Sequence, residues 1–367
     1  MTWDWGKARE EYAWLAVCAA TAAVTFVVAS IAGYSGGVPA YRVAFLYMKI
    51  IFTLGPAAIL LAAIPLFVAA IVMRIPDPLT RVKAYMKERF GTPALALAGL
   101  APIVVVPVMM GAFGTLKMLM PVTRNFTWDD LLANADKALF LGYHPWQYTH
   151  ALFGGAAATK LIDVGYTAWV ALLFTAVLYF AWLAPRYERA RFFLSFTAAW
   201  LLIGVVGAYA LASAGPCYTA AIGAVSASEF QPLMDRLRAI HEGGTFLAAY
   251  DWQGALWEHH VNREYAFAMG VSAMPSMHNA ITILYALTLR RARPAYRLTA
   301  WAFVAMIFLG SVHLGWHYAL DGIVAWAMMW AIWVAAGAFL DRSGYSAAVR
   351  GENAEAAPHF AGRPVTI

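Results

Sequence analysis

The feature that most restricts the fold of this chain is a series of apolar stretches, each long enough to cross a membrane. A transmembrane helix needs about 20 mostly apolar residues, and windows of that length give eight candidates along the chain. The sixth candidate is the shortest and carries Pro275, Ser276 and His278 at its start. The predicted spans are residues 12–34, 52–73, 93–116, 162–184, 193–214, 274–289, 298–316 and 319–340.

Composition excludes two other classes of protein. The chain is 62% hydrophobic and 13% charged, whereas a soluble domain is about 45–50% apolar and about 25% charged. Such a chain is neither a water-soluble enzyme nor an intrinsically disordered protein. The predicted fold class is therefore all-α, a polytopic integral membrane bundle of about eight transmembrane helices.

The basic residues predict the orientation of these spans. Seventeen of the 26 Lys and Arg residues fall in five ends or loops that share one side if eight spans alternate. The positive-inside rule makes that side cytoplasmic, which places both termini inside the cell. The net charge of +6 then reflects topology and contacts with headgroups, and no nucleic-acid partner is expected. The five groups are Lys7 and Arg9; Arg74, Arg81, Lys83, Lys87 and Arg89; Arg186, Arg189 and Arg191; Arg290, Arg291, Arg293 and Arg297; and Arg342, Arg350 and Arg363.

Two long segments, 117–161 and 215–274, are expected on the opposite, outer face. Together with the adjoining helix ends they hold eight of the nine histidines, all except His359. Thr127 to Asp130 resemble a capping box. The residues that follow predict an amphipathic interfacial helix, with a helix packed on other extramembrane segments as the alternative. Its predicted apolar stripe is Leu131, Leu132, Ala135 and Leu139, with Asp129, Asp136 and Lys137 off the stripe.

Two short strings carry residues suited to chemistry. One runs from Ala273 to Asn279 and the other from Gly310 to Asp321. In the second string His317 and Asp321 are four residues apart, a spacing that places both on one face of a helix. An Asp there can accept a hydrogen bond from one ring nitrogen of the His, which fixes the tautomer and leaves the other nitrogen basic. An ionisable pair at a membrane helix end is a functional hypothesis, and a structural hydrogen bond is the alternative.

Together the two strings resemble the type 2 phosphatidic acid phosphatase superfamily, whose pattern is Lys-x6-Arg-Pro, Pro-Ser-Gly-His and Ser-Arg-x5-His-x3-Asp. Here Pro275-Ser276-Met277-His278 matches the second element with Met in place of Gly. In the third element Gly310 and Ser311 occupy the Ser-Arg positions, while His317 and Asp321 match. The residues of these two motifs are more similar to the branch of inositol phosphorylceramide and sphingomyelin synthases, whose members also lack the Arg. The resemblance covers about residues 110–335.

The resemblance implies phosphoryl or phosphodiester transfer through a covalent phosphohistidine. In the mechanism implied by the resemblance, His317 attacks phosphorus and Asp321 orients the imidazole ring of His317. His278 protonates the departing oxygen and later activates the acceptor, and Ser276 holds phosphate oxygens. A neutral imidazole is a competent nucleophile near neutral pH, and a second His can serve as acid and then base. No metal or other cofactor is expected for this chemistry.

The cations that would neutralise the phosphate are less well defined. Lys117 and Arg124 fit the family's Lys-x6-Arg, but Asn125 replaces its Pro, and a pair of side chains snorkelling to the interface is the alternative. Ser311 is a further candidate for phosphate binding. Arg236, Arg238 and Arg263 could replace the missing Arg. His313 and Tyr218 are possible pocket residues, and His241, His259 and His260 are expected to be solvated rather than metal ligands.

The resemblance implies an inner-membrane, multi-pass lipid phosphotransferase whose active site faces the extracytoplasmic side. Its partners would be a membrane phospholipid or lipid phosphate and a lipid hydroxyl acceptor within the bilayer. A lipid phosphate phosphatase that uses water is the alternative, and a transporter is a remote one. The predicted domains are a two-helix N-terminal extension (1–92), a six-helix catalytic membrane domain (93–340) and a disordered cytoplasmic tail (341–367).

Overall fold

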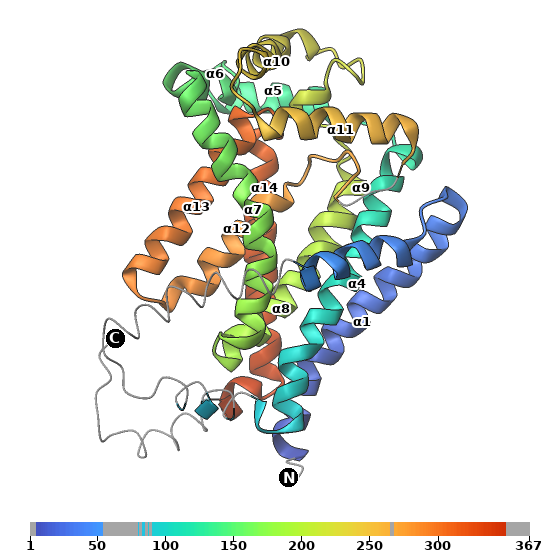
Figure 1. Ribbon diagram of the computed structural model, residues 1–367, viewed down its shortest axis with the longest axis vertical. Coiled ribbons are helices and arrows are strands. Elements are labelled where there is room, and N and C mark those ends of the chain that lie inside the picture. Colours follow the sequence, from blue (N-terminus) through green and yellow to red (C-terminus); the bar gives the residue numbers. More distant parts are fainter. Residues whose placement is uncertain are drawn as a thin grey trace.

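The computed structural model describes residues 5–53, 80, 83–84, 87, 90–264 and 268–349. Within these ranges the chain is helical and contains no strand, which confirms the all-α prediction (Figure 1). The main helices are α1 (Trp5–Gly36), α4 (Pro93–Thr123), α5 (Asp129–Leu139), α6 (Pro145–Phe153), α7 (Ala156–Trp182), α8 (Arg186–Leu201), α9 (Ala208–Ala210), α10 (Ala227–Glu242), α11 (Ala248–Asn262), α12 (Met277–Thr288), α13 (Pro294–His313) and α14 (Ala319–Arg342).

Six stretches of helix in the described part are long and apolar enough to cross a membrane, so the protein is a multi-pass membrane protein. They correspond to α1, α4, α7, α13, α14 and a continuous span in which a π-helical segment, Leu202–Gly207, joins α8 to α9. The predicted second span, 52–73, lies outside the described residues from position 54 onward.

The predicted sixth span is a short helix. Helix α12 has 12 residues, which is about 18 Å of helix and less than the roughly 30 Å of a hydrocarbon core. It packs between α8, α13 and α14 inside the bundle, and every residue from Asn279 to Ala286 is buried. A helix enclosed by neighbours need not cross the bilayer, so it can bring its N-terminal residues to a site within the protein.

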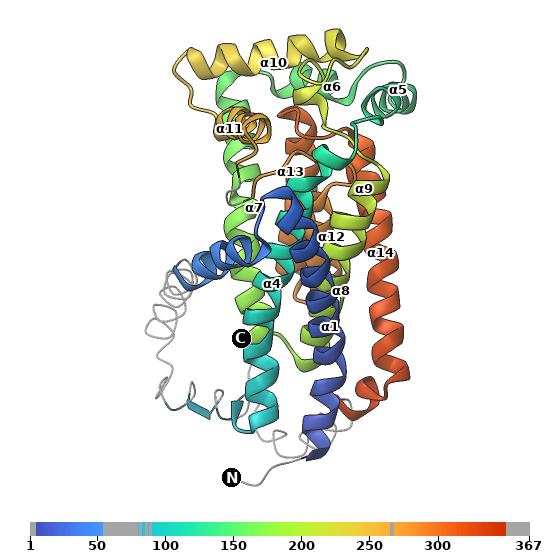
Figure 2. The ribbon, with the colours of Figure 1, turned by 90° about the vertical axis from the view of Figure 1, so that its right-hand side faces the viewer.

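The N-terminal helix α1 lies against α4 and α8 (Figure 2). A buried ionic cluster fixes this contact: the Glu11 carboxylate accepts a hydrogen bond from Nε of Arg186 at 2.7 Å and lies 3.4 Å from the guanidinium of Arg189. Trp14 Nε1 and the Tyr345 hydroxyl also donate to Glu11. The cluster therefore joins α1 to the first turn of α8 and to the segment after α14.

Helices α5, α6, α10 and α11 form a cap at one end of the bundle (Figures 1 and 2). Carboxylates in and under the cap accept backbone N–H groups from other segments. Asp136 accepts from the amides of Ala319 and Leu320, at 2.6 and 2.9 Å, and so holds the first turn of α14. Asp163 on α7 does the same for Ala248 and Ala249 at the start of α11.

The packing of α5 differs from the sequence prediction. The capping box is wrong, because the N-cap is Trp128, which makes no side-chain capping bond, and Asp130 accepts from the amide and hydroxyl of Ser226 instead. The predicted position of the two aspartates is also wrong. Asp129 and Asp136 were expected off the packed face of α5, but both are buried on it together with Leu132. The buried face of α5 therefore fits the alternative interpretation, a helix packed on other extramembrane segments. Leu131 and Leu139 remain exposed.

Candidate active site

The loop between α13 and α14 carries His317 and lies beneath the cap. Helix α13 ends at His313, and Gly315 turns the chain with φ of +74°, a conformation that glycine adopts without strain. The amide of His317 donates to the carbonyl of Ser311 at 3.0 Å, which fixes the loop. Because α14 starts at Ala319, His317 precedes that helix rather than sharing a face with Asp321 as predicted.

The predicted contact between His317 and Asp321 is nevertheless present. Nδ1 of His317 lies 3.1 Å from Oδ2 of Asp321. The same carboxylate oxygen accepts the backbone N–H of Tyr318 at 3.2 Å, so Asp321 is the N3 residue of a capping box that begins at Tyr318 and starts α14. Both side chains are buried, and the second carboxylate oxygen, Oδ1, has no hydrogen-bond partner among the described residues.

His278, in the first turn of α12, faces His317. The centroids of the two rings are 6.0 Å apart and their planes are inclined by 59°. The two imidazoles, which come from separate segments of the chain, are therefore neighbours at one site. The backbone amide of Ser276 donates to the carbonyl of Asp321 at 3.1 Å, which ties the two sequence strings together directly.

Asn279 joins the same two strings through its side chain. Its amide nitrogen donates to the hydroxyl oxygens of Ser276 at 3.1 Å and Ser311 at 3.0 Å. The Ser311 hydroxyl itself donates to the carbonyl of Ile307 at 2.6 Å, and Ser276 caps α12 by accepting the backbone N–H of Asn279. Both predicted phosphate-binding serines are thus engaged in internal hydrogen bonds. The bridging role of Asn279 was not predicted, since the only signal was its place next to His278.

The first amides of α12 are a further set of donors at the site. Ser276 satisfies the amide of Asn279, whereas the amides of Met277 and His278 belong to the first turn, which has no acceptor within its own helix. The partial positive charge at a helix start favours an anion there. These amides lie in the same turn as the ring of His278.

Of the predicted cations, Lys117 is the one that the structure associates with the two histidines. It lies in the last third of α4, and its ammonium group acts electrostatically on both rings. Burial and this charge lower the pKa of His317 to about 3, a shift that the carbonyl of Ala273 opposes. His317 is therefore a neutral imidazole at physiological pH. Gly270, with φ of +106°, lies against the backbone of Lys117, where an added Cβ would come within 3.0 Å.

The other predicted cations lie apart from this pair of rings. Arg124 is exposed at the C-cap of α4, seven residues and about 10 Å of helix beyond Lys117. Arg236 donates to the carbonyl of Gly154, and Arg238 contacts the hydroxyl of Tyr250. Arg263 is the left-handed C-cap residue of α11.

The two predicted pocket residues belong to neighbouring clusters. His313 is buried, with its ring nitrogens 3.0 Å from the hydroxyl of Thr159 and 3.2 Å from that of Thr149, and it packs on His150. It does not share a helical face with His317, since α13 ends at His313. Tyr218 donates to the carbonyl of Gln253 at 3.0 Å.

Aromatic side chains surround His278. Tyr166 stacks on its ring with centroids 4.9 Å apart, and Trp169 lies 4.1 Å away. Trp316, the neighbour of His317 in sequence, stacks on Tyr166 at 6.4 Å. The sequence did not predict these residues, because Tyr and Trp are common in membrane helices and their spacing gives no sign of a partner on another helix.

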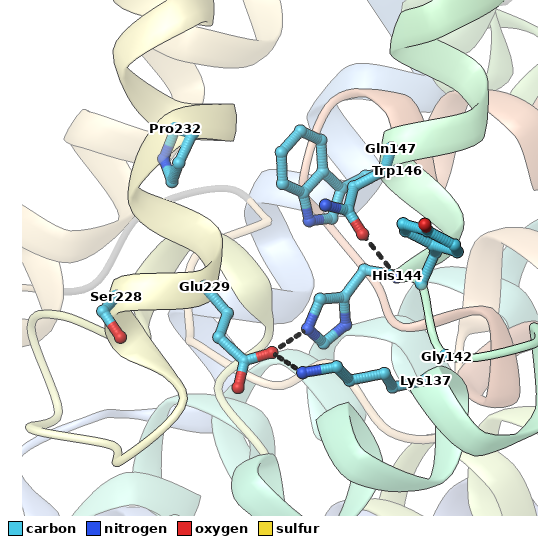
Figure 3. Close-up of a pocket in the computed structure, with 9 residues that line it drawn as sticks. Lys137, Gly142, His144, Trp146, Gln147, Ser228, Glu229 and Pro232 are labelled. Atoms are coloured by element: carbon cyan, nitrogen blue, oxygen red, sulfur yellow. Dashed lines mark hydrogen bonds and ion pairs between the residues drawn. The ribbon is translucent and has the colours of Figure 1, made fainter.

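A separate surface pocket lies within the cap (Figure 3). Glu229 is contacted there by Nε2 of His144 and by the ammonium of Lys137, and these two donors lower the pKa of the Glu229 carboxyl. His144 packs on Phe230, which packs on Tyr318, next to the catalytic candidate His317. Through Phe230, this pocket is therefore connected to the residue that follows His317.

A comparison with protein-family models matches residues 130–335 to the PAP2 superfamily. The chain belongs to the PAP2 superfamily. The matched range contains both strings and leaves out α1 and α4. A search of curated proteins and a search of solved structures gave no match. As a PAP2 superfamily member with several membrane helices, the protein is a lipid enzyme of the phosphatase or phosphotransferase type.

Proposed function

We propose that this PAP2 superfamily protein is a lipid phosphotransferase that moves a phosphoryl or phospho-headgroup between lipids through a phosphohistidine. The observation that carries the proposal is the facing pair of imidazoles, His278 and His317, with Asp321 on Nδ1 of His317. Two neighbouring imidazoles suit a displacement at phosphorus in which one is the nucleophile and the other the acid and base. This chemistry was expected from the sequence strings, and the geometry supports it.

In the first step, Nε2 of neutral His317 attacks the phosphorus of the donor lipid. The bond from phosphorus to the leaving oxygen breaks, and that oxygen takes its electron pair together with a proton from His278, which enters this step as the imidazolium and leaves it neutral. Asp321 accepts a hydrogen bond from Nδ1–H and stabilises the positive charge that develops on the ring. Lys117 and the first amides of α12 stabilise the phosphate oxygens, a role that pre-organised donors perform without a metal.

In the second step, His278 removes a proton from the hydroxyl of an acceptor lipid. The oxygen of that hydroxyl attacks phosphorus, the phosphorus–nitrogen bond breaks, and His317 recovers its electron pair. If water takes the place of the lipid hydroxyl, the same residues give a phosphatase. The burial of His317 and the packing of Tyr166 and Trp169 on the ring of His278 restrict water at the site and favour the lipid acceptor.

The site would open to the extracytoplasmic leaflet. Its loop and the cap lie at one end of α14, while Arg342 and the basic first turn of α8 lie at the other end (Figure 1). The positive-inside rule assigns the basic end to the cytoplasm, with both termini.

The test is to incubate purified protein in liposomes with a radiolabelled phospholipid, with and without a ceramide or diacylglycerol acceptor. We expect labelled product lipid that depends on the acceptor, and an acid-labile radiolabel on the protein in the absence of acceptor. His317→Ala should abolish both signals, while His259→Ala, a control in the cap, should retain them. Release of water-soluble phosphate regardless of acceptor would contradict the transferase, and full activity in His317→Ala would exclude the phosphohistidine.

A further inference from the structure

Three buried hydrogen-bond donors gather around the candidate catalytic residue His278 without an acceptor. They are the hydroxyl of Tyr166 and the indole N–H groups of Trp169 and Trp316, each without a hydrogen-bond partner among the described residues. Leaving a buried donor unpaired is unfavourable, and most such groups in native proteins are paired. A cluster of them therefore indicates a ligand that supplies acceptors.

The three side chains come from two separate parts of the chain and meet at one place. Tyr166 and Trp169 lie one helical turn apart on α7, and both contact the ring of His278, at 4.9 and 4.1 Å between centroids. Trp316 comes from the loop before α14 and stacks nearly parallel on Tyr166, with 12° between the planes. The cluster thus connects the ring of His278 to the residue that precedes His317 in the sequence.

Unpaired indole groups also occur elsewhere in the described part of the chain. Trp200 on α8 has an unpaired Nε1, but it packs on Phe113 and Phe196 within the bundle. The site around His278 differs because three unpaired donors belong to one cluster of contacting rings, and because two acceptors of the same site, Oδ1 of Asn279 and Oδ1 of Asp321, are also unpaired. This concentration of unpaired polar atoms coincides with the place where the reacting group must enter.

We propose that Tyr166, Trp169 and Trp316 bind the substrate by donating hydrogen bonds to oxygen acceptors at or next to its phosphorus. The inference rests on the proposed function, since it takes the gap between His278 and His317 as the place of the phosphoester. Indole N–H groups donate and do not accept, so their partners are acceptor atoms. Tyr166 stacks on His278 and on Trp316, and Trp169 contacts His278 at a tilted angle, so the ring faces are engaged and the polar atoms remain for the ligand.

These donors carry no net charge, unlike the arginine that the family has at the position of Ser311. They would position phosphoester oxygens by hydrogen bonds while Lys117 supplies the positive charge. The acceptors could be the non-bridging oxygens on phosphorus or the ester oxygens of the adjoining lipid. The two sources share the same chemistry and can be separated by the choice of probe.

The experiment measures equilibrium binding to the full-length protein in detergent, in a His317→Ala background so that no turnover occurs. Three probes are used: inorganic phosphate, phosphatidic acid and phosphatidylglycerol. Tyr166→Phe, Trp169→Phe and Trp316→Phe each remove one donor and keep the ring, and Trp200→Phe is the matched control. We expect each loss to raise Kd about 3- to 10-fold, as for one hydrogen bond, and the control to leave Kd within about 2-fold.

An increase in Kd for inorganic phosphate as well as for the lipids assigns the donors to the oxygens on phosphorus. An increase for the lipids alone assigns them to the neighbouring ester oxygens. Unchanged Kd values in all three variants, or no binding of any probe to the parent protein, would overturn the inference. If Trp169→Phe fails to give a monodisperse protein, the other two variants decide. Turnover by the protein with His317 intact is scored separately, so loss of the proposed function is distinguishable from loss of this binding role.

Discussion

Asp321, in the first turn of α14, contacts the ring of His317, which lies in the loop before that helix. Oδ2 of Asp321 lies 3.1 Å from Nδ1 of His317 and also accepts the N–H of Tyr318, so one oxygen both starts α14 and orients the imidazole. Asp136 reinforces this turn by accepting the amides of Ala319 and Leu320. The position of the ring therefore depends on the N-terminus of α14.

Replacement of Asp321 by Asn should remove most of the activity. The neutral amide cannot stabilise a positive charge on His317, and it can present an N–H toward Nδ1 and favour the wrong tautomer. We expect kcat to fall by about 10²–10⁴-fold, with a smaller change in KM. The measurement is steady-state turnover in liposomes at matched expression. A variant that retains more than a tenth of the activity would contradict an orienting role.

Lys117→Met should weaken the binding of the phosphate group and so lower kcat/KM. Its ammonium acts on both rings, whereas Arg124 is exposed beyond it on α4. We expect kcat/KM to fall by about 10–100-fold, as for loss of one charged donor in a buried site. Arg124→Met is the matched control and should change kcat/KM by less than about 3-fold. Equal losses in the two variants would show that the Lys-x6-Arg pair acts as a unit.

Asn279→Ala should lower both stability and activity. The Asn279 amide holds Ser276 and Ser311 together, and all three residues are buried. Removing it leaves two buried hydroxyls without this partner, at a cost of about 1–3 kcal/mol. The apparent melting temperature in detergent reports this change. Ser311→Ala, which keeps the contact between Asn279 and Ser276, should have a smaller effect, and the reverse order would contradict the bridging role.

Protonation of His317 should not change kcat/KM across the physiological pH range. Its pKa is lowered to about 3, so the ring is protonated only below that value and is neutral at every higher pH. Acidification from pH 8 to pH 5 therefore leaves the nucleophile unprotonated. An NMR titration of labelled His317 should show no protonation above pH 5. Half-protonation near pH 6.5, the usual value for histidine, would contradict the prediction.

Glu11→Gln should detach α1 from α8. Glu11 and Arg189 are both almost fully buried, and loss of the carboxylate leaves that guanidinium charge uncompensated. Removing one partner of a buried pair costs about 3–5 kcal/mol. Glu10→Gln is the control, because Glu10 is partly exposed and its contact with Arg186 is 3.3 Å long, an ion pair worth about 0–1 kcal/mol. Melting temperatures that fall equally in both variants would contradict the importance of the buried cluster.

Much of this arrangement could be predicted from the sequence. Long apolar stretches predicted a helical membrane bundle, because a chain in lipid must satisfy its backbone within helices or closed barrels. The two short strings predicted that His278, His317 and Asp321 would be neighbours, and the distances agree. That the three residues perform catalysis stays a prediction.

Tertiary packing decided the rest. Local periodicity predicted that α5 would turn its aspartates away from the packed face, yet Asp129 and Asp136 are buried because other segments bring unpaired N–H groups to them. Spacing also could not separate Lys117 from Arg124, since both fit the same pattern, and only the tertiary structure shows that Lys117 acts on the two histidines while Arg124 is exposed. Short-range sequence determines helices and the turns between them, whereas the partner of a buried polar group often lies in a distant part of the sequence and is set by how the helices pack.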